Sequence, residues 1–329
     1  MMRALVYTGV ETLEMRDVPR PVAGVGQSLV RIHASGLCGS DMHAYLGHDE
    51  RRPAPLILGH EAAGVVEGSG RRVTINPLVT CGSCDACKRG RDNLCPDRMI
   101  ISMPPREGAF APYVAIADTN LVTVPEDVPL EKAALAEPLA CGWHAVRLAE
   151  EAADRPLDQA RCAVIGGGAI GVGAALALRA FGAVDITVIE PNDTRRAVLD
   201  GIDGFTAIGA GAFEGAAHVV IDAVGYAGTR ADASAMANPG GVIVHIGLGD
   251  GDGGLDIRRM TLHEITFIGS YTYTMADFQD TAQVIFDGSL GALDWFEARP
   301  LSEGATAFSD LCADRVAAPK IIFIPDQEE

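Results

Sequence analysis

Four cysteines lie close together in one short segment of the chain, Cys81, Cys84, Cys87 and Cys95, with the spacing C-x2-C-x2-C-x7-C. Four thiolates at this spacing can form the tetrahedral shell that Zn²⁺ adopts in structural sites. Because that shell is closed, the metal would stabilise a lobe and take no part in chemistry. Disulfides and an iron–sulfur cluster are the alternatives, and the lack of an apolar export signal argues against disulfides. The sequence therefore predicts a structural zinc site.

A second set of metal-binding side chains precedes this segment. The stretch Cys38-Gly39-Ser40-Asp41-Met42-His43 is followed by Gly59-His60-Glu61-Ala62-Ala63-Gly64. A thiolate, an imidazole and a carboxylate are the ligand types of a catalytic zinc, which keeps one position for water or substrate. Each residue alone would be interpreted as an ordinary core or surface side chain. The prediction of a catalytic metal therefore depends on their occurring together.

The second half of the chain carries a dinucleotide-binding fingerprint. An apolar run, Cys162–Ile165, is typical of a buried parallel strand, and G-x-G-x-x-G then opens an alanine-rich stretch. The glycines permit a tight turn and a close approach of the backbone to a pyrophosphate at a helix N-terminus. The residues of this motif that we expect at the cofactor are Gly166, Gly168, Ile170 and Gly171.

An acidic residue stands at the distance that the fingerprint requires. Glu190 ends the apolar run Ile186–Ile189, nineteen residues past Gly171. A carboxylate there accepts hydrogen bonds from the ribose 2′-hydroxyl and repels a 2′-phosphate, which favours NAD over NADP. Arg195 and Arg196 keep NADP open, because either could bind a 2′-phosphate; Arg195 could instead stack on the adenine.

The region after Arg161 alternates short apolar runs with turns, which predicts a doubly wound parallel sheet. The expected strands are Cys162–Ile165, Ile186–Ile189, His218–Asp222, Val242–Ile246 and Ile265–Gly269. Ligands bind at the carboxyl ends of such strands. This rule adds further residues to the expected cofactor site: Asp222, Ala223, Val224, Gly225, Gly247, Leu248, Ser270 and Tyr271.

The first part of the chain instead has short β-like runs broken by proline and glycine, which predicts an antiparallel, barrel-like lobe. The expected strands are Ala4–Tyr7, Ser28–Ala34, Ala62–Glu67 and a segment at Tyr113–Ala115, and Lys320–Ile324 is expected to return to this lobe as its last strand.

Three motifs, in this order, resemble the zinc-dependent medium-chain dehydrogenases, and in particular their sorbitol-dehydrogenase-like branch. They are the Cys38–His43 stretch, the Gly59–Gly64 stretch and the four-cysteine spacing. The resemblance implies a GroES-like β-barrel catalytic domain at 1–140 and 275–329, and a Rossmann dinucleotide-binding domain at 141–274. One departure is a shortened segment at 64–73, which puts the local geometry there in doubt.

The resemblance also implies roles for individual residues. Cys38 and His60 would bind the catalytic zinc, and Glu61 would be a ligand or would alternate with water as one. Glu137 matches a carboxylate that the polyol branch places at the metal. Asp41 would orient His60. Ser40 and His43 match a relay that carries the substrate proton to solvent through the cofactor ribose.

These assignments predict oxidation of a secondary hydroxyl of a polyol or sugar alcohol with NAD, and reduction of the ketone in reverse. The alternatives are a threonine- or simple-alcohol-type dehydrogenase, an NADP-dependent carbonyl reductase, or a zinc-stabilised nucleotide-binding protein without activity. A binding protein has no need of an open metal site and a proton relay, so we favour the enzyme.

Composition limits the partners. The 329 residues carry a formal net charge of −18, which disfavours nucleic acid and anionic membranes as partners because phosphates need a basic face. The uncharged run Cys162–Leu178 is too short and too rich in glycine for a membrane span.

We expect a cytoplasmic protein whose remaining cysteines, Cys141, Cys162 and Cys312, are packing residues. The family resemblance implies a homodimer or homotetramer.

Overall fold

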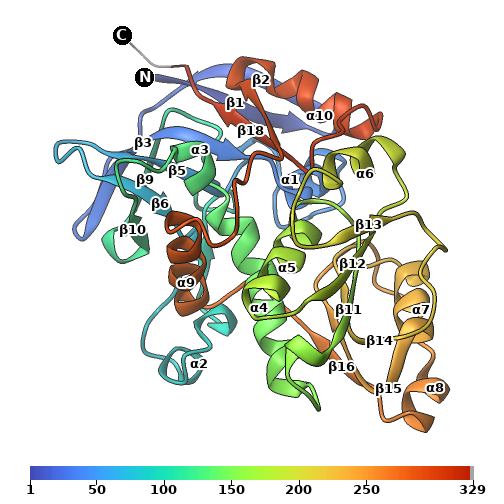
Figure 1. Ribbon diagram of the computed structural model, residues 1–329. Helices are drawn as coiled ribbons and strands as arrows, with labels where there is room; N and C mark the ends of the chain where they lie inside the picture. The colour runs from blue at the N-terminus through green and yellow to red at the C-terminus, as the bar shows by residue number, and fades with distance from the viewer. Residues whose placement is uncertain (327–329) are drawn as a thin grey trace. The chain divides into compact units, whose positions relative to one another are not determined.

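The computed structural model describes residues 1–326 and divides into two compact units (Figure 1). Unit 1 comprises Met1–Glu137, Thr274–Gly288 and the chain from Phe296 onward; unit 2 comprises Pro138–Tyr273 and Ser289–Trp295. No helix in the described part of the chain is long and apolar enough to cross a membrane.

Unit 1 is built mainly from antiparallel sheets. A seven-stranded sheet has the order β10-β6-β5-β3-β18-β17, with β9 also paired to β3. Its strands are β3 (Gln27–Gly36), β5 (Glu61–Val66), β6 (Arg72–Ile75), β9 (Tyr113–Ala117), β10 (Leu121–Thr123), β17 (Phe296–Pro300) and β18 (Lys320–Ile324). A three-stranded sheet has the order β2-β1-β4, from β1 (Met2–Gly9), β2 (Thr12–Val18) and β4 (Leu56–Ile57). These strands confirm the β-rich lobe that the sequence predicted.

Short elements complete unit 1. The helices are α1 (Gly39–Tyr45), α2 (Asp85–Lys88), α3 (Leu130–Ala133), α9 (Met275–Phe286) and α10 (Gly304–Cys312), and β7 (Leu78–Val79) pairs with β8 (Met99–Ile100). Phe308 of α10 and Phe323 of β18 both pack against Phe110, with ring centroids 6.2 and 5.1 Å from it. All three rings are fully buried. They hold the C-terminal strand in the core that carries the metal-binding motifs.

The shortened segment at 64–73 forms a tight hairpin between β5 and β6. Gly68 and Gly70 have φ values of +83° and +70°, which a side chain would rarely adopt. The hairpin closes through a hydrogen bond from the Val66 amide to the Arg71 carbonyl at 2.8 Å. The shortening is therefore absorbed in a regular turn, and the pairing of β5 with β3 is kept.

Unit 2 is a six-stranded parallel sheet in the order β13-β12-β11-β14-β15-β16. Its strands are β11 (Arg161–Ile165), β12 (Asp185–Ile189), β13 (Thr206–Ile208), β14 (Ala217–Asp222), β15 (Ala237–His245) and β16 (Thr266–Gly269). Its helices are most of α4 (Ala136–Ala152), α5 (Ala169–Ala180), α6 (Asp193–Leu199), α7 (Ala227–Met236) and α8 (Ile257–Leu262). The order places β11, which precedes the glycine fingerprint, beside both β12 and β14. This is the Rossmann arrangement that the sequence predicted.

Candidate functional site

Antiparallel pairing of β3 with β5 assembles the predicted catalytic metal site. In this register Gly36 lies opposite Glu61, so Cys38, two residues past the end of β3, comes beside His60 and Glu61 at the start of β5. One potential ligand atom from each of the three residues lies within 4.8 Å of the other two. His60 and Glu61 are buried and Cys38 is half-buried. This donor set fits a zinc ion that leaves a position open.

Asp41 connects the two segments that carry these ligands. Its Oδ2 accepts the Cys38 amide at 3.0 Å, and its Oδ1 accepts the Gly59 amide at 3.2 Å and lies 3.6 Å from His60 Nδ1. Burial alone would lower the pKa of His60, but the Asp41 carboxylate and Cys38 outweigh it and raise that pKa well above its usual value. The carboxylate lies on the Nδ1 side of the ring, so Nε2 is the nitrogen that a metal would use.

Two residues that sequence reasoning missed support the same imidazole. The Ser102 hydroxyl lies 3.3 Å from His60 Nδ1. Arg52, which is 4% exposed, donates to the Ser102 carbonyl at 3.0 Å and to the Ser40 carbonyl at 2.9 Å. Arg52 therefore connects helix α1 to the segment that carries Ser102. A lone serine and a lone arginine in loops gave no signal in the sequence.

Glu61 has a buried partner far along the chain. Lys320 Nζ donates to Glu61 Oε1 at 2.6 Å and Oε2 at 2.8 Å, and to the Leu37 carbonyl at 2.8 Å. Both charged side chains are at most 5% exposed. A Cβ at Gly36 would lie 1.9 Å from Glu61 Oε2, so only glycine leaves room for this carboxylate. The family resemblance implied that Glu61 is a ligand or alternates with water as one, and this role stays a prediction; in the structure its carboxylate is paired with Lys320.

The remaining residues predicted at this centre lie near it. Glu137, in the first turn of α4, is 7% exposed and lies outside the group of three ligand atoms within 4.8 Å. Its charge nevertheless helps Glu61 and Cys38 to raise the pKa of Lys320 against the effect of burial. Ser40 and His43 are half-buried and stand three residues apart on α1. Their roles, and that of Glu137 as a ligand, stay predictions.

The four-cysteine segment has the geometry of a closed metal site. One sulfur from each of Cys81, Cys84, Cys87 and Cys95 lies within 4.8 Å of the others, and none is in a disulfide. Cys81 and Cys87 Sγ are 4.0 Å apart, close to the roughly 3.8 Å edge of a tetrahedron of sulfurs about 2.3 Å from zinc. Backbone amides of Ser83 and Cys84 lower the pKa of Cys81 to about 6, which favours the thiolate that a metal needs.

The fingerprint glycines have the backbone geometry that a dinucleotide site requires. Gly166 has a φ of +99°, which a tight turn needs. A Cβ at Gly168 would meet nothing within 4 Å, so the backbone there is open to a pyrophosphate, whereas a Cβ at Gly171 would lie 1.8 Å from the Gly166 carbonyl oxygen. The third glycine therefore allows close packing of α5 on the strand, and the arrangement fits a nicotinamide dinucleotide.

Glu190 is fixed beside this turn. Its Oε2 accepts the Gly167 amide at 2.9 Å and its Oε1 accepts the Asn192 amide at 2.8 Å, while Arg195 Nη1 lies 3.6 Å from Oε2. A cavity of about 510 Å³ opens here, and its lining includes Gly166, Glu190, Arg195, Phe213, Thr229 and Met236. Four of the residues predicted at the cofactor thus line one cavity: Gly166, Glu190, Arg195 and Val224.

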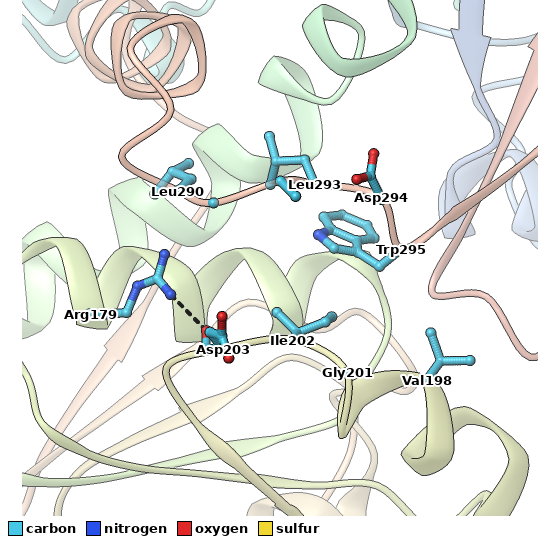
Figure 2. A pocket seen from close by; sticks show the side chains of 11 residues that line it. Arg179, Val198, Gly201, Ile202, Asp203, Leu290, Leu293, Asp294 and Trp295 are labelled. Atoms are coloured by element: carbon cyan, nitrogen blue, oxygen red, sulfur yellow. Dashed lines mark hydrogen bonds between the residues drawn. The ribbon is translucent and has the colours of Figure 1, made fainter.

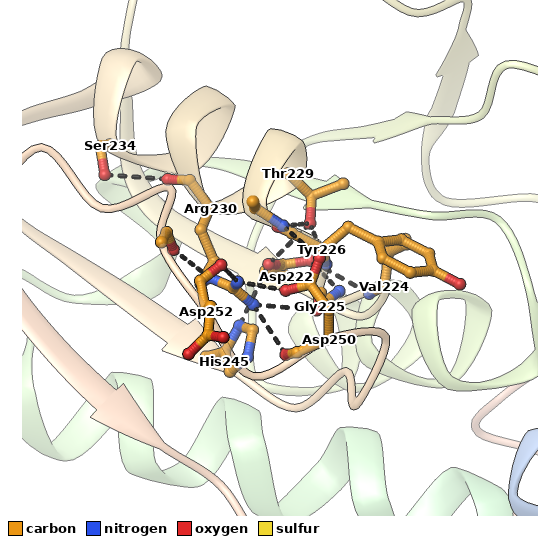
Figure 3. A network of polar contacts seen from close by, with 12 residues as sticks. Asp222, Val224, Gly225, Tyr226, Thr229, Arg230, Ser234, His245, Asp250 and Asp252 are labelled. Carbon is orange, nitrogen blue, oxygen red and sulfur yellow. Dashed lines mark hydrogen bonds and ion pairs between the residues drawn. The ribbon is translucent and has the colours of Figure 1, made fainter. Parts of the chain in front are cut away.

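The loops after β14 and β15 are held together by a polar network (Figure 3). Asp222 accepts the Val224 and Gly225 amides and the Thr229 hydroxyl, each at 3.0 Å, and lies 3.1 Å from His245 Nδ1. Burial would raise the pKa of Asp222, but these partners lower it. The network fixes the loop that carries Gly225 at the carboxyl edge of the sheet.

Arg230 fixes the second loop of this edge. Its guanidinium donates to the Gly225 and Gly253 carbonyls at 2.9 and 2.7 Å and forms an ion pair with Asp250. A Cβ at Gly247 would lie 2.2 Å from Val224 backbone, so the two loops are in close contact. Of the other predicted residues, Leu248 is 70% exposed, and Ser270 donates its amide to the His245 carbonyl at 2.9 Å. Tyr271 follows Ser270 after β16, and these roles stay predictions.

Two family models match the chain. "Alcohol dehydrogenase GroES-like domain" matches residues 24–126, and "Zinc-binding dehydrogenase" matches residues 169–287. "Probable D-xylulose reductase A" of Arthroderma otae is 31% identical over 87% of this chain and 87% of its own length. L-galactonate-5-dehydrogenase of Escherichia coli is 30% identical over 88% of this chain and 89% of its own length. The chain belongs to the zinc-dependent medium-chain dehydrogenase family.

Solved structures agree with this membership. A protein of Sinorhizobium meliloti, described as a zinc-binding dehydrogenase and bound to NADP, has a TM-score of 0.87 and 27% identity and covers 99% of each chain. The predicted GroES-like and Rossmann classes are thereby confirmed. The medium-chain dehydrogenase is an oxidoreductase that acts on CH–OH groups and depends on zinc and a nicotinamide dinucleotide.

Proposed function

We propose that this medium-chain dehydrogenase oxidises a secondary hydroxyl of a polyol or sugar derivative to the ketone, with NAD as hydride acceptor. The observation that carries the proposal is the group formed by Cys38, His60 and Glu61, with the imidazole held by Asp41. Support for the substrate class comes from relatives that include sorbitol dehydrogenase of Bacillus subtilis, 35% identical over 58% of this chain and 56% of its own length.

The residues of unit 1 have distinct tasks in this proposal. Bound zinc supplies a Lewis acid that lowers the pKa of a substrate hydroxyl, and the nicotinamide accepts the hydride. Asp41 keeps the His60 ring oriented. The substrate hydroxyl proton leaves toward the Ser40 hydroxyl and then the His43 imidazole, which stand on one face of α1 and are partly open to solvent. Glu61, which Lys320 holds in the structure, would be a further residue to hold the zinc.

A variant pair tests the metal site. Cys38→Ser should reduce bound zinc from about two to about one per chain and remove nearly all turnover, because a hydroxyl is a poor ligand for zinc. Cys312→Ser is the matched control, since Cys312 is exposed and lies outside both groups of ligand atoms. Zinc is measured by elemental analysis and turnover on a panel of polyols, threonine and primary alcohols. Full activity of Cys38→Ser would refute the site, and activity confined to threonine or primary alcohols would refute the substrate class.

The preference for NAD is part of the proposal and is tested separately. Glu190 lines the cavity of about 510 Å³ beside the glycine turn, which we call the nucleotide cavity, and would accept a hydrogen bond from the ribose 2′-hydroxyl. Glu190→Ala should relax discrimination against NADP, measured as the ratio of kcat/KM with the two cofactors. An unchanged ratio would assign this role to another residue. Arg195, in the same cavity, is the side chain that would favour NADP.

Assembly and location complete the proposal. We place the enzyme in the cytoplasm, where reducing conditions keep the five cysteines of the two metal sites as thiols. We expect a homodimer or homotetramer, which light scattering of the purified protein would test.

A further inference from the structure

A second cavity in unit 2 has no part in the function described above. It measures about 290 Å³ and lies between the end of α6 with the turn that follows and the segment 289–295 (Figure 2). Its lining shares no residue with the nucleotide cavity. The apolar side chains that line it are Val198, Ile202, Leu290, Leu293 and Trp295. A cavity of about 150 Å³ already holds benzene, so this one has room for roughly a dozen non-hydrogen atoms.

One buried polar group in the lining lacks a partner. Trp295 is 5% exposed, and its Nε1 is closed to solvent and has no hydrogen-bond partner within residues 1–326. Figure 2 shows the indole nitrogen on the edge of the ring that faces Arg179 and Ile202 across the cavity. A buried N–H without a partner destabilises a protein. An acceptor atom bound along this edge of the ring would remove that cost.

The frame of the cavity is fixed. Arg179 donates to the Asp203 carbonyl at 2.7 Å and to the Ser289 carbonyl at 3.3 Å, so it connects the two walls. Leu293 has a φ of +55°, a left-handed conformation that bulky residues rarely adopt. Its side chain is 4% exposed and lines the cavity in spite of this strain.

Charge selects the kind of ligand. The lining carries the Arg179 guanidinium and the carboxylates of Asp203 and Asp294, so it is negative by one charge overall and disfavours an anion. An uncharged molecule with an apolar body matches the leucine, isoleucine and valine side chains, and a carbonyl oxygen matches the Trp295 N–H. We propose that this cavity binds a small neutral carbonyl compound, such as a carboxamide, whose oxygen accepts the hydrogen bond of Trp295 Nε1.

Intrinsic fluorescence gives a direct assay, because the chain has only two tryptophans. Trp143→Phe leaves Trp295 as the single reporter and replaces a ring that packs on Phe181 with another aromatic ring. Titration of this variant with cyclohexanecarboxamide should give a saturable change in emission. The corresponding carboxylate, cyclohexanecarboxylate, should bind several-fold more weakly. No saturable change up to the solubility limit would overturn the proposal.

Two further variants locate the bound probe. Val198→Phe, in the Trp143→Phe background, fills the cavity and should abolish the response, whereas Ala197→Phe, at the exposed neighbouring position of α6, should keep it. Trp295→Phe removes the donor together with part of the ring that carries it, and calorimetry should then show affinity about two- to tenfold weaker. Equal binding by Val198→Phe and Ala197→Phe, or full affinity in Trp295→Phe, would refute the assignment. Zinc content and NADH binding of the variants should match those of the parent, which separates this test from that of the proposed function.

Discussion

Replacement of Lys320 by methionine tests the electrostatics of the catalytic centre most sharply. The substitution keeps the approximate length of the side chain but removes its charge and three hydrogen bonds, two to Glu61 and one to the Leu37 carbonyl. Glu61 is fully buried, so its carboxylate would remain in the interior without a cation. Breaking a buried ion pair from one side costs about 3–5 kcal/mol. We expect the metal-free Lys320→Met protein to lose that much stability.

A loss of this size is large compared with the whole stability of a folded unit, about 5–15 kcal/mol. It should lower the melting temperature of unit 1 by about 6–20 °C, since 1 kcal/mol moves Tm by about 2–4 °C in proteins of this size. Because the chain has two compact units, calorimetry should be analysed for two transitions and not as one. The loss should fall in the zinc-loaded protein, where the metal would supply the charge that Lys320 supplied.

Two controls complete this experiment. Lys88→Met makes the same change at an exposed position and should shift the unfolding free energy by no more than about 0.5 kcal/mol. Lys320→Arg keeps the charge and should recover part of the loss. If metal-free Lys320→Met is within about 1 kcal/mol of the parent, the buried pair does not carry the energy that we assign to it. Equal losses with and without zinc would show that Glu61 does not respond to the metal.

Three further predictions concern other parts of the chain. Cys87→Ser should release one zinc per chain, and unchanged zinc content by elemental analysis would contradict the closed site. It should also destabilise the start of α9, because the Asp92 carboxylate beside the cysteines accepts the Met275 amide there at 3.1 Å. Arg230→Met should raise the KM for NAD several-fold with a smaller change in kcat, because the substitution releases the loop at Asp250 from the carboxyl edge of the sheet. An unchanged KM would mean that NAD binding does not depend on the position of this loop. The folded-state pKa of Asp222 is depressed, so its stabilising contribution is complete above the unfolded value of about 3.9 and is lost as pH falls through the folded value. Acid unfolding should therefore lose part of its pH dependence in Asp222→Asn, and identical acid titrations of the two proteins would refute this.

The sequence predicted the sheet of unit 2 well because each buried parallel strand is a short apolar run. The five expected strands all form, with bounds that differ by a few residues. It missed β13 (Thr206–Ile208), because a three-residue strand between glycine-rich turns has no measurable periodicity. The apolar run Lys320–Ile324 was correctly expected to end in the first lobe, where it pairs with β3 and β17.

The candidate site could be predicted only where its residues form a motif. Cys38, His60 and Glu61 belong to stretches that resemble a family, and the structure brings their ligand atoms together. Lys320 lies 259 residues from Glu61 in sequence, and no local pattern connects them. A signal was nevertheless present: a lysine at the start of the run KIIFI is costly to bury without a partner, which points to a carboxylate in the interior.

The balance of charge at this centre indicates why the pair is kept. Four acidic groups face the same interior: Cys38, Asp41, Glu61 and Glu137. Burial would raise the pKa of Asp41, but His60 and then Arg52 lower it, and the other three acidic groups raise the pKa of Lys320. If Cys38 binds as a thiolate and His60 as a neutral ligand, two negative charges stay uncompensated, which equals the charge of one divalent ion. Lys320 therefore fits the site to a dication. The Lys320→Met substitution should make zinc bind more tightly while it destabilises the metal-free fold, and the zinc affinity is measured by equilibrium competition with a chelator. Weaker zinc binding by Lys320→Met would show that the lysine serves the geometry of Glu61 and not the charge of the centre.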